Sequence, residues 1–192
     1  MLMARIVGAV TLAVLLTGTT AQAEGKHPMV LMSTSLGDIK IELNEEKAPI
    51  TVKNFLDYVN AKFYDGTIFH RVIPGFMIQG GGFDKDMKPR RTRASIKNEA
   101  GNGLKNTVGT IAMARTGVVD SATAQFFINV KDNTSLDHRN DTPQGFGYAV
   151  FGRVVDGLDV VHNIEHVPTT TNGAHHNVPI RPVIISSVTV VQ

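Results

Sequence analysis

Cysteine is absent from the 192-residue chain, and so is tryptophan. Without a thiol the protein can form no disulfide, offers no thiolate nucleophile or metal ligand, and cannot be lipid-modified at a cysteine. Acidic and basic residues nearly balance, 17 against 19, so the chain has no general attraction to nucleic acid or to a membrane. These absences exclude several classes of enzyme and of binding protein.

Long linkers and internal repeats are missing as well. No tract of Pro, Gly or Ser is long enough to separate two domains, and no segment recurs at a fixed period. Hydrophobic residues make up 42% of the chain, which suits one compact core at this length. We therefore expect a single domain.

An apolar stretch near the start, residues 6–16, is too short to cross a bilayer as a helix. The basic Arg5 precedes it, and the small-residue sequence Ala-Gln-Ala at 21–23 follows it. A retained membrane anchor, the alternative, would need about 18 apolar residues. We interpret residues 1–23 as a secretory signal peptide cleaved after Ala23, and residues 24–192 as the exported domain, in which 18 basic and 17 acidic residues remain.

Alternation of apolar and polar residues predicts strands in much of the exported domain. Residues 38–43 alternate strictly and follow residues 30–32 across a Ser-Leu-Gly turn, which predicts a hairpin. Further short strands, punctuated by glycine, are expected at residues 67–72, 76–79, 109–114, 125–130, 148–154 and 183–191.

Helical spacing of apolar residues occurs twice. Positions 52, 55, 56 and 59 predict an amphipathic helix of about three turns with Thr51 as its N-cap. Positions 158, 161 and 164 predict a second helix with Asp156 as its N-cap. Many short strands with two helices indicate a mainly β fold, a closed antiparallel barrel whose ends the helices cover.

The segment FHRVIPGFMIQGGG, residues 69–82, sets one guanidinium, Arg71, and one amide, Gln79, among apolar residues. A cation in such surroundings needs an acceptor, which is either an internal carboxylate or a group that arrives from outside. Taken from the residues alone, a structural arginine paired with an internal acid remains open.

The segment QFFINV, residues 125–130, has two different faces. Its even-numbered residues are all apolar and predict a core face, whereas Gln125, Phe127 and Asn129 share the other face. That second face combines an aromatic ring with two amides. It suits the floor of a peptide-binding site better than a core.

Three other patterns have weaker functional interpretations. His175 and His176 are adjacent and cannot both face one ion from a strand, so we expect a loop there and neither a metal site nor a cofactor. Ser121, with Asp137 and His138, suggests a hydrolase triad but lacks the GxSxG turn. Residues 85–93 hold five basic residues and one acid, and we expect a solvated loop, with selection of acidic or unfolded clients as the alternative.

Four segments of the chain, in order, resemble the cyclophilin family. They are FHRVIPGFMIQGGG at 69–82, MAR at 113–115, QFFINV at 125–130 and VFG at 150–152. The resemblance covers residues 30–191 and is closest to the exported bacterial branch of these peptidyl-prolyl cis-trans isomerases. It implies a closed eight-stranded antiparallel β-barrel capped by two α-helices, a periplasmic location and a monomer without a cofactor.

The same resemblance implies the site residues. Arg71 and Gln79 are the expected catalytic residues. The expected substrate-binding residues are Phe76, Met77, Ala114, Arg115, Thr116, Gln125, Phe127, Leu136 and Tyr148. Where many relatives have a tryptophan and a histidine this chain has Ser135 and Tyr148, and the missing tryptophan leads us to expect only weak cyclosporin binding.

Prolyl isomerisation suits a site without a nucleophile, because rotation about the C–N bond breaks conjugation, at about 18–20 kcal/mol, and no covalent bond. The expected partners are proline-containing peptides and unfolded or flexible proteins, with no nucleic acid and no membrane. Two alternatives remain: a chaperone that holds apolar segments, with incidental isomerisation, and a binder of anionic surfaces or nucleic acid through residues 85–93.

Overall fold

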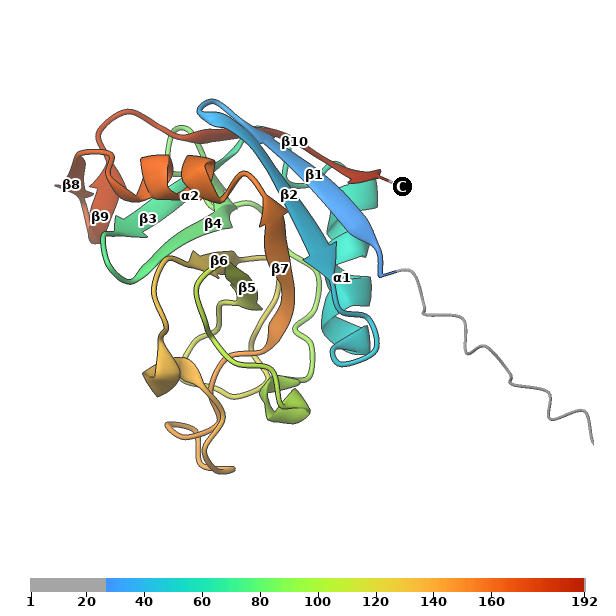
Figure 1. Ribbon diagram of the computed structural model, residues 1–192. Coiled ribbons are helices and arrows are strands. Elements are labelled where there is room, and N and C mark those ends of the chain that lie inside the picture. Colours follow the sequence, from blue (N-terminus) through green and yellow to red (C-terminus); the bar gives the residue numbers. More distant parts are fainter. Residues whose placement is uncertain (1–26, 192) are drawn as a thin grey trace, which may run out of the picture.

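The computed structural model describes residues 27–191, so the expected signal peptide, residues 1–23, lies outside it. Within that range the chain forms a closed barrel of eight antiparallel strands with two α-helices (Figure 1). The helices are α1 (Pro49–Asn60) and α2 (Leu158–Glu165). The barrel strands are β1 (Met29–Thr34), β2 (Gly37–Leu43), β3 (Thr67–Ile73), β4 (Met77–Asp84), β5 (Thr110–Met113), β6 (Phe126–Asn129), β7 (Val150–Asp156) and β10 (Ile184–Val191).

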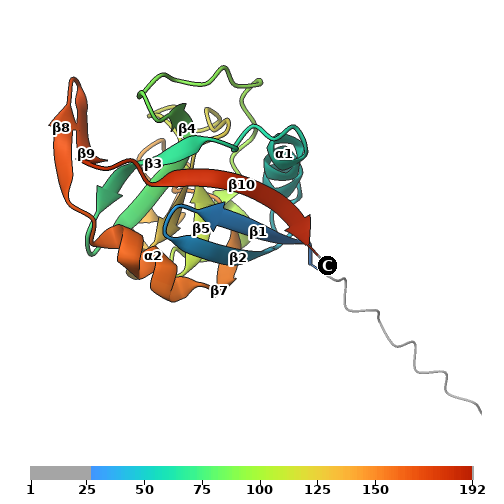
Figure 2. The same cartoon turned by 90° about the horizontal axis from the view of Figure 1, so that it is seen from above.

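The order of strands around the barrel is β1-β10-β3-β4-β6-β5-β7-β2, and β2 closes it by pairing with β1. The predicted fold is therefore confirmed. The two helices lie on different sides of the barrel in both views (Figures 1 and 2). Among residues 27–191, no helix is long and apolar enough to cross a membrane.

The core fills the barrel and extends to both helices. Phe126, Ile128 and Val130, predicted to face inward, are buried there. The ring of Phe55 on α1 lies 5.9 Å from that of Phe126 and 5.2 Å from that of Phe151, centroid to centroid. The spacing that predicted α1 thus reflects its packing onto the barrel.

A two-stranded hairpin, β8 (Thr169–Asn172) and β9 (His175–Pro179), was not predicted. It stands apart from the barrel beside the end of β3, as both views show (Figures 1 and 2). The expected loop at His175 and His176 is wrong, because both residues lie in β9. Its strands are mostly exposed and polar, so they lack the apolar alternation that marks a half-buried strand.

Both predicted helix caps are wrong. Helix α1 begins at Pro49, so Thr51 lies inside the helix and is not its N-cap. The carboxylate of Glu99, which is distant in the sequence, binds the free amides of the first turn. It accepts from the amide of Ile50 at 3.1 Å and from that of Thr51 at 2.8 Å. The N-cap residue of helix α2 is Gly157 and not the predicted Asp156.

Gly157 is required at that position for a steric reason. Its φ is +80°, a conformation that L side chains rarely adopt, and a Cβ there would collide with the carbonyl oxygen of Asp38. The close approach of α2 to β2 therefore requires a glycine before the helix. Capping by a side chain does not determine this residue.

We predict that Glu99→Ala lowers the free energy of unfolding by about 1–2 kcal/mol, as the loss of a helix cap does. The carboxylate also accepts the Thr51 hydroxyl at 2.6 Å, so three donors lose their partner. Urea unfolding followed by circular dichroism measures the change. The matched control is Glu45→Ala, an exposed acid, with an expected change below about 0.5 kcal/mol; equal effects would contradict the assignment.

Candidate active site

Three neighbouring strands bring the expected catalytic residues together. In the register of β3 with β4, Arg71 lies opposite Gln79, and in that of β4 with β6, Gln79 lies opposite Phe127. The three residues thus form a row across the sheet. Because antiparallel strands pair far-apart segments, the site combines parts of the sequence that are about 50 residues apart.

A chain of hydrogen bonds orients the guanidinium of Arg71. Its Nη1 donates to Oε1 of Gln79 at 3.3 Å, and Nε2 of Gln79 donates to Oε1 of Gln125 at 2.9 Å. Gly82 makes room for the last amide, since a Cβ there would collide with the side chain of Gln125. No carboxylate within residues 27–191 forms an ion pair with Arg71, which is half-buried. The alternative of an arginine paired with an internal acid therefore does not describe this structure.

An apolar cluster separate from the barrel core lies next to this row. Its buried members include Met77 and Phe127, only 2% and 4% exposed, and the half-buried Phe76 and Leu136 pack against them. Ala114 and Tyr148 belong to the same cluster. All four residues expected to hold the proline ring are thus gathered in one place.

Arg115 stabilises the edge of the cluster around Tyr148, which we call the rim. Its guanidinium lies 4.9 Å from the ring centroid of Tyr148, Nε donates to the carbonyl of Gly147 at 2.9 Å, and Nη2 donates to that of Pro143 at 2.9 Å. The side chain of Arg115 therefore supports the rim, and the neighbouring Thr116 hydroxyl donates to Ser121 Oγ at 2.8 Å.

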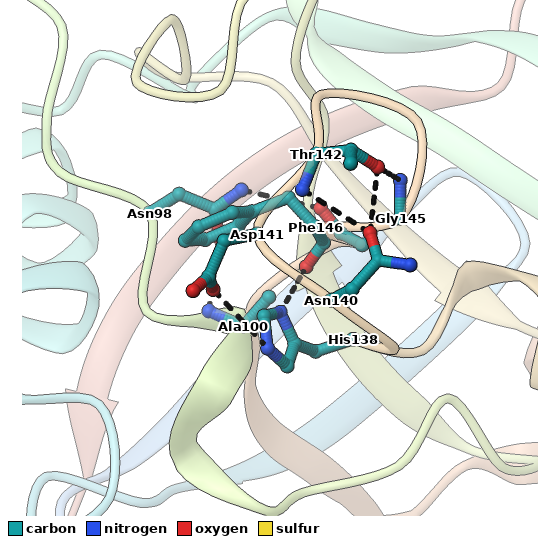
Figure 3. A network of polar contacts seen from close by, with 9 residues as sticks. Asn98, Ala100, His138, Asn140, Asp141, Thr142, Gly145 and Phe146 are labelled. Carbon is teal, nitrogen blue, oxygen red and sulfur yellow. Dashed lines mark hydrogen bonds and ion pairs between the residues drawn. The ribbon is translucent and has the colours of Figure 1, made fainter.

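The segment that Arg115 holds is also closed by its own polar contacts (Figure 3). Nδ1 of His138 lies 2.9 Å from the carbonyl oxygen of Phe146, and Oδ1 of Asn140 accepts the hydroxyl of Thr142 at 2.6 Å. In a hydrolase triad the hydroxyl of Ser121 would donate to His138, but here it donates to the carbonyl of Val118. His138 and Ser121 are thus engaged in separate loops, and no hydrolase triad forms.

Asn129 does not belong to the peptide-binding floor, contrary to the sequence prediction. It is fully buried, and its Nδ2 donates to Oδ1 of Asn106 at 3.2 Å and to Oγ1 of Thr110 at 2.9 Å. Its Oδ1 accepts from Nδ2 of Asn133 at 2.7 Å. Residues before β5 and after β6 cover this end of the strand, so the face that alternation predicted to be open is closed.

Two residues that sequence reasoning missed hold the turn that carries Phe76. The carboxylate of Glu165 on α2 accepts the amide of Gly75 at 2.6 Å, and Nδ2 of Asn133 donates to the carbonyl of Phe76 at 2.7 Å. The two residues of each contact are far apart in the sequence, by 90 positions for Glu165 and Gly75 and by 57 for Asn133 and Phe76. No local motif indicates such contacts. Burial acts to raise the pKa of Glu165, but the hydrogen bonds from His162 and Gly75 outweigh it, and the pKa lies below its usual value.

His70, the neighbour of Arg71, is buried, with 5% of its surface exposed. Its ring lies 4.6 Å from that of Phe83, and no hydrogen-bond partner for its Nδ1 is found among the described residues. Burial, followed by the nearby His175, lowers the pKa of His70 to about 4. The ring is therefore neutral at physiological pH. Within residues 27–191 no group of three His, Asp or Glu side chains is arranged to hold a metal ion.

Comparison with known sequences gives one family. The sequence model described as "Cyclophilin type peptidyl-prolyl cis-trans isomerase/CLD" matches residues 29–190. Peptidyl-prolyl cis-trans isomerase A of Dickeya dadantii is 53% identical over 189 residues, 98% of each chain. Peptidyl-prolyl cis-trans isomerase B of Escherichia coli is 60% identical over 162 residues, 84% of this chain and 99% of that protein.

Comparison with solved structures agrees. The crystal structure of a cyclophilin type peptidyl-prolyl cis-trans isomerase of Cryptosporidium parvum has a TM-score of 0.71 and 27% identity, and the match covers 86% of this chain and 98% of that chain. A crystal structure of the same protein in the presence of the dipeptide Ala-Pro has a TM-score of 0.70 at 27% identity, with coverage of 85% and 99%.

We predict that His70 makes the protein less stable as the pH falls from 6.5 to 4. In this range the unfolded chain, with a pKa of 6.5, binds the proton that the folded His70, with a pKa of about 4, does not. The loss amounts to roughly 3 kcal/mol of unfolding free energy. Urea unfolding at several pH values should show a flatter profile for His70→Gln.

The matched control for this profile is His166→Gln, which removes the exposed histidine that follows α2 as its C-cap residue. It should reproduce the wild-type dependence on pH. A profile for His70→Gln as steep as that of the wild type would contradict the prediction.

Proposed function

Because this chain belongs to the cyclophilin-type peptidyl-prolyl cis-trans isomerase family and is an enzyme of that activity, we propose that Arg71 is the group that stabilises the twisted prolyl amide. One observation carries the proposal. A half-buried guanidinium, oriented by Gln79 and paired with no carboxylate of residues 27–191, lies next to an apolar cluster.

The apolar cluster would hold the proline ring while the residue on its N-terminal side rotates. Phe76, Met77, Phe127 and Leu136 offer the ring apolar contacts, and the amides of Gln79 and Gln125 offer hydrogen bonds to the peptide backbone. Ala114, Arg115 and Thr116 would contact the peptide through their main chain, since the side chain of Arg115 already supports the rim.

The chemistry follows from the electronic change during rotation. As the C–N bond twists, conjugation is lost and the proline nitrogen regains a lone pair that can accept a hydrogen bond. A fixed donor such as Arg71 then binds the twisted amide better than either planar form, and that difference lowers the barrier. Gln79 acts by orienting the donor.

The required reduction in the activation free energy of rotation is within the range that such a site can supply. Uncatalysed exchange takes tens to hundreds of seconds. A turnover of roughly 1–10³ s⁻¹ requires the site to remove about 3–7 kcal/mol from the barrier. One charge-assisted hydrogen bond, with desolvation and positioning, supplies energies of this order.

We further propose that the substrates are proline-containing segments of unfolded or flexible exported proteins, that the enzyme acts as a monomer in the periplasm, and that cyclosporin binds weakly. A relative crystallised in the presence of Ala-Pro supports the substrate class. Similarity to bacterial isomerases and the sequence of residues 1–23 support export. Ser135, at the position where many relatives have a tryptophan, supports weak cyclosporin binding.

We predict that Arg71→Ala lowers kcat/KM for a proline tetrapeptide by about 10²-fold or more, while peptide affinity changes much less, because the donor acts mainly on the twisted amide. NMR measurement of cis–trans exchange at the prolyl bond gives the catalysed rate, and calorimetry gives the affinity for the peptide. The matched control is Arg153→Ala, which removes an exposed arginine paired with Glu42 on the β2–β7 side of the barrel and should leave catalysis unchanged. An Arg71→Ala enzyme with wild-type kcat/KM would refute the role.

We predict that the full 192-residue chain, expressed in a Gram-negative host, is recovered from the periplasmic fraction with Glu24 as its first residue, as intact mass and N-terminal sequencing would show. Replacing Ala21 and Ala23 by leucine should block cleavage, because the site requires small side chains. Replacing Gln22 by leucine is the matched control and should not. Recovery of the uncleaved chain from the cytoplasm would contradict the interpretation.

A further inference from the structure

A second groove, of ≈ 480 Å³, shares Arg71, Gln79 and Gln125 with the candidate active site. Its other walls are His70 of β3, Phe83 of β4 and residues 174–177 around the start of β9. The hairpin that the sequence did not predict therefore forms one side of a cavity that reaches the catalytic guanidinium. A peptide bound at Arg71 would extend past this hairpin on one side of its proline.

The hairpin contacts the barrel through aromatic rings. These contacts are tilted and edge-to-face rather than parallel: the ring of Phe83 lies 4.6 Å from that of His70, at 53° between the planes, and 5.1 Å from that of His175, at 70°. The next residue, His176, is exposed, and its Nδ1 lies 3.1 Å from the hydroxyl of Thr171. Both histidines of β9 line the groove.

The polar groups of the groove are all cationic, imidazole or amide. One guanidinium, three imidazoles and three side-chain amides line it, and none of its lining residues is an acid. His70 is 95% buried, and its Nδ1 has no partner within the described chain, although buried polar atoms in folded proteins are nearly always hydrogen-bonded. A carboxylate is the group that this set complements, since it accepts from guanidinium, imidazole and amide donors alike.

We propose that this groove is a subsite for an acidic side chain, so that the enzyme prefers peptides with Glu or Asp near the proline. The inference rests on the proposed function, because the groove includes Arg71. The histidines of β9 select the acidic residue, and the barrel residues align the peptide for isomerisation. The basic residues 85–93 do not line the groove and are not needed for the preference.

The test compares kcat/KM for pairs of short peptides that differ only in Glu against Gln. The pair is placed in turn at each of the two positions before and the two positions after the proline. At one of these positions the wild type should prefer Glu by about 3- to 10-fold at low salt, and the preference should shrink as salt screens the charge. That position identifies the peptide residue that reaches the groove.

The variant His175→Glu/His176→Glu places negative charge at the groove and should abolish or reverse the preference, measured as the ratio of kcat/KM for the Glu peptide to kcat/KM for its Gln partner in the same variant. Because His175 packs on Phe83, the single variant His176→Glu, at an exposed position, decides the matter should the double variant fail to fold. The matched control is His27→Glu, the same change in a groove beside β2 and β7, which should keep the wild-type preference.

The outcomes separate the two proposals. Efficient turnover of Gln and Glu peptides without a difference at any position would overturn the subsite and leave the proposed function intact. So would a preference for Glu that persists unchanged in His176→Glu, since the acidic residue would then be bound elsewhere. Arg71→Ala as active as the wild type on the Gln peptides would overturn the proposed function and, with it, this inference.

Discussion

The site depends on a positive charge that the fold orients but does not neutralise. The amides of Gln79 and Gln125 hold the guanidinium of Arg71 in a chain of hydrogen bonds. An amide oxygen accepts an N–H bond without carrying a net charge, so the cation keeps its capacity for a partner from outside. In a half-buried position that capacity is stronger than in bulk water, because the effective dielectric constant is lower.

Three carboxylates of the described chain bind main-chain amides. Glu99 binds the free amides at the start of α1, Glu165 binds the amide of Gly75, and Asp137 binds the amide of Asn106 at 2.8 Å. Each satisfies a main-chain donor that would otherwise be left unpaired. These acids thus stabilise loops and a helix end, while no carboxylate of residues 27–191 forms an ion pair with Arg71.

How much the sequence predicted depends on the range of the interactions involved. Strand alternation and helical spacing are local, and they predicted the barrel and both helices. Long-range contacts decided what was missed: Gly157 precedes α2 because the main chain of Asp38 lies against it, and Asn129 is buried because Asn106 and Asn133 cover it. Phe76 and Leu136 were predicted as pocket residues only through the resemblance of whole segments, since neither has a local pattern that signals a pocket.

In the mechanism that we propose, catalysis by differential binding gives these long-range contacts a purpose beyond stability. A site that makes no covalent bond gains rate only from groups that already stand in the geometry of the twisted amide. The turn before Phe76 is held at the amide of Gly75 by Glu165 and at the carbonyl of Phe76 by Asn133 and by the amide of Val130. Because three residues from two segments fix one turn, the proposed apolar wall would need little rearrangement when a proline ring enters, and binding energy would remain available to distort the amide.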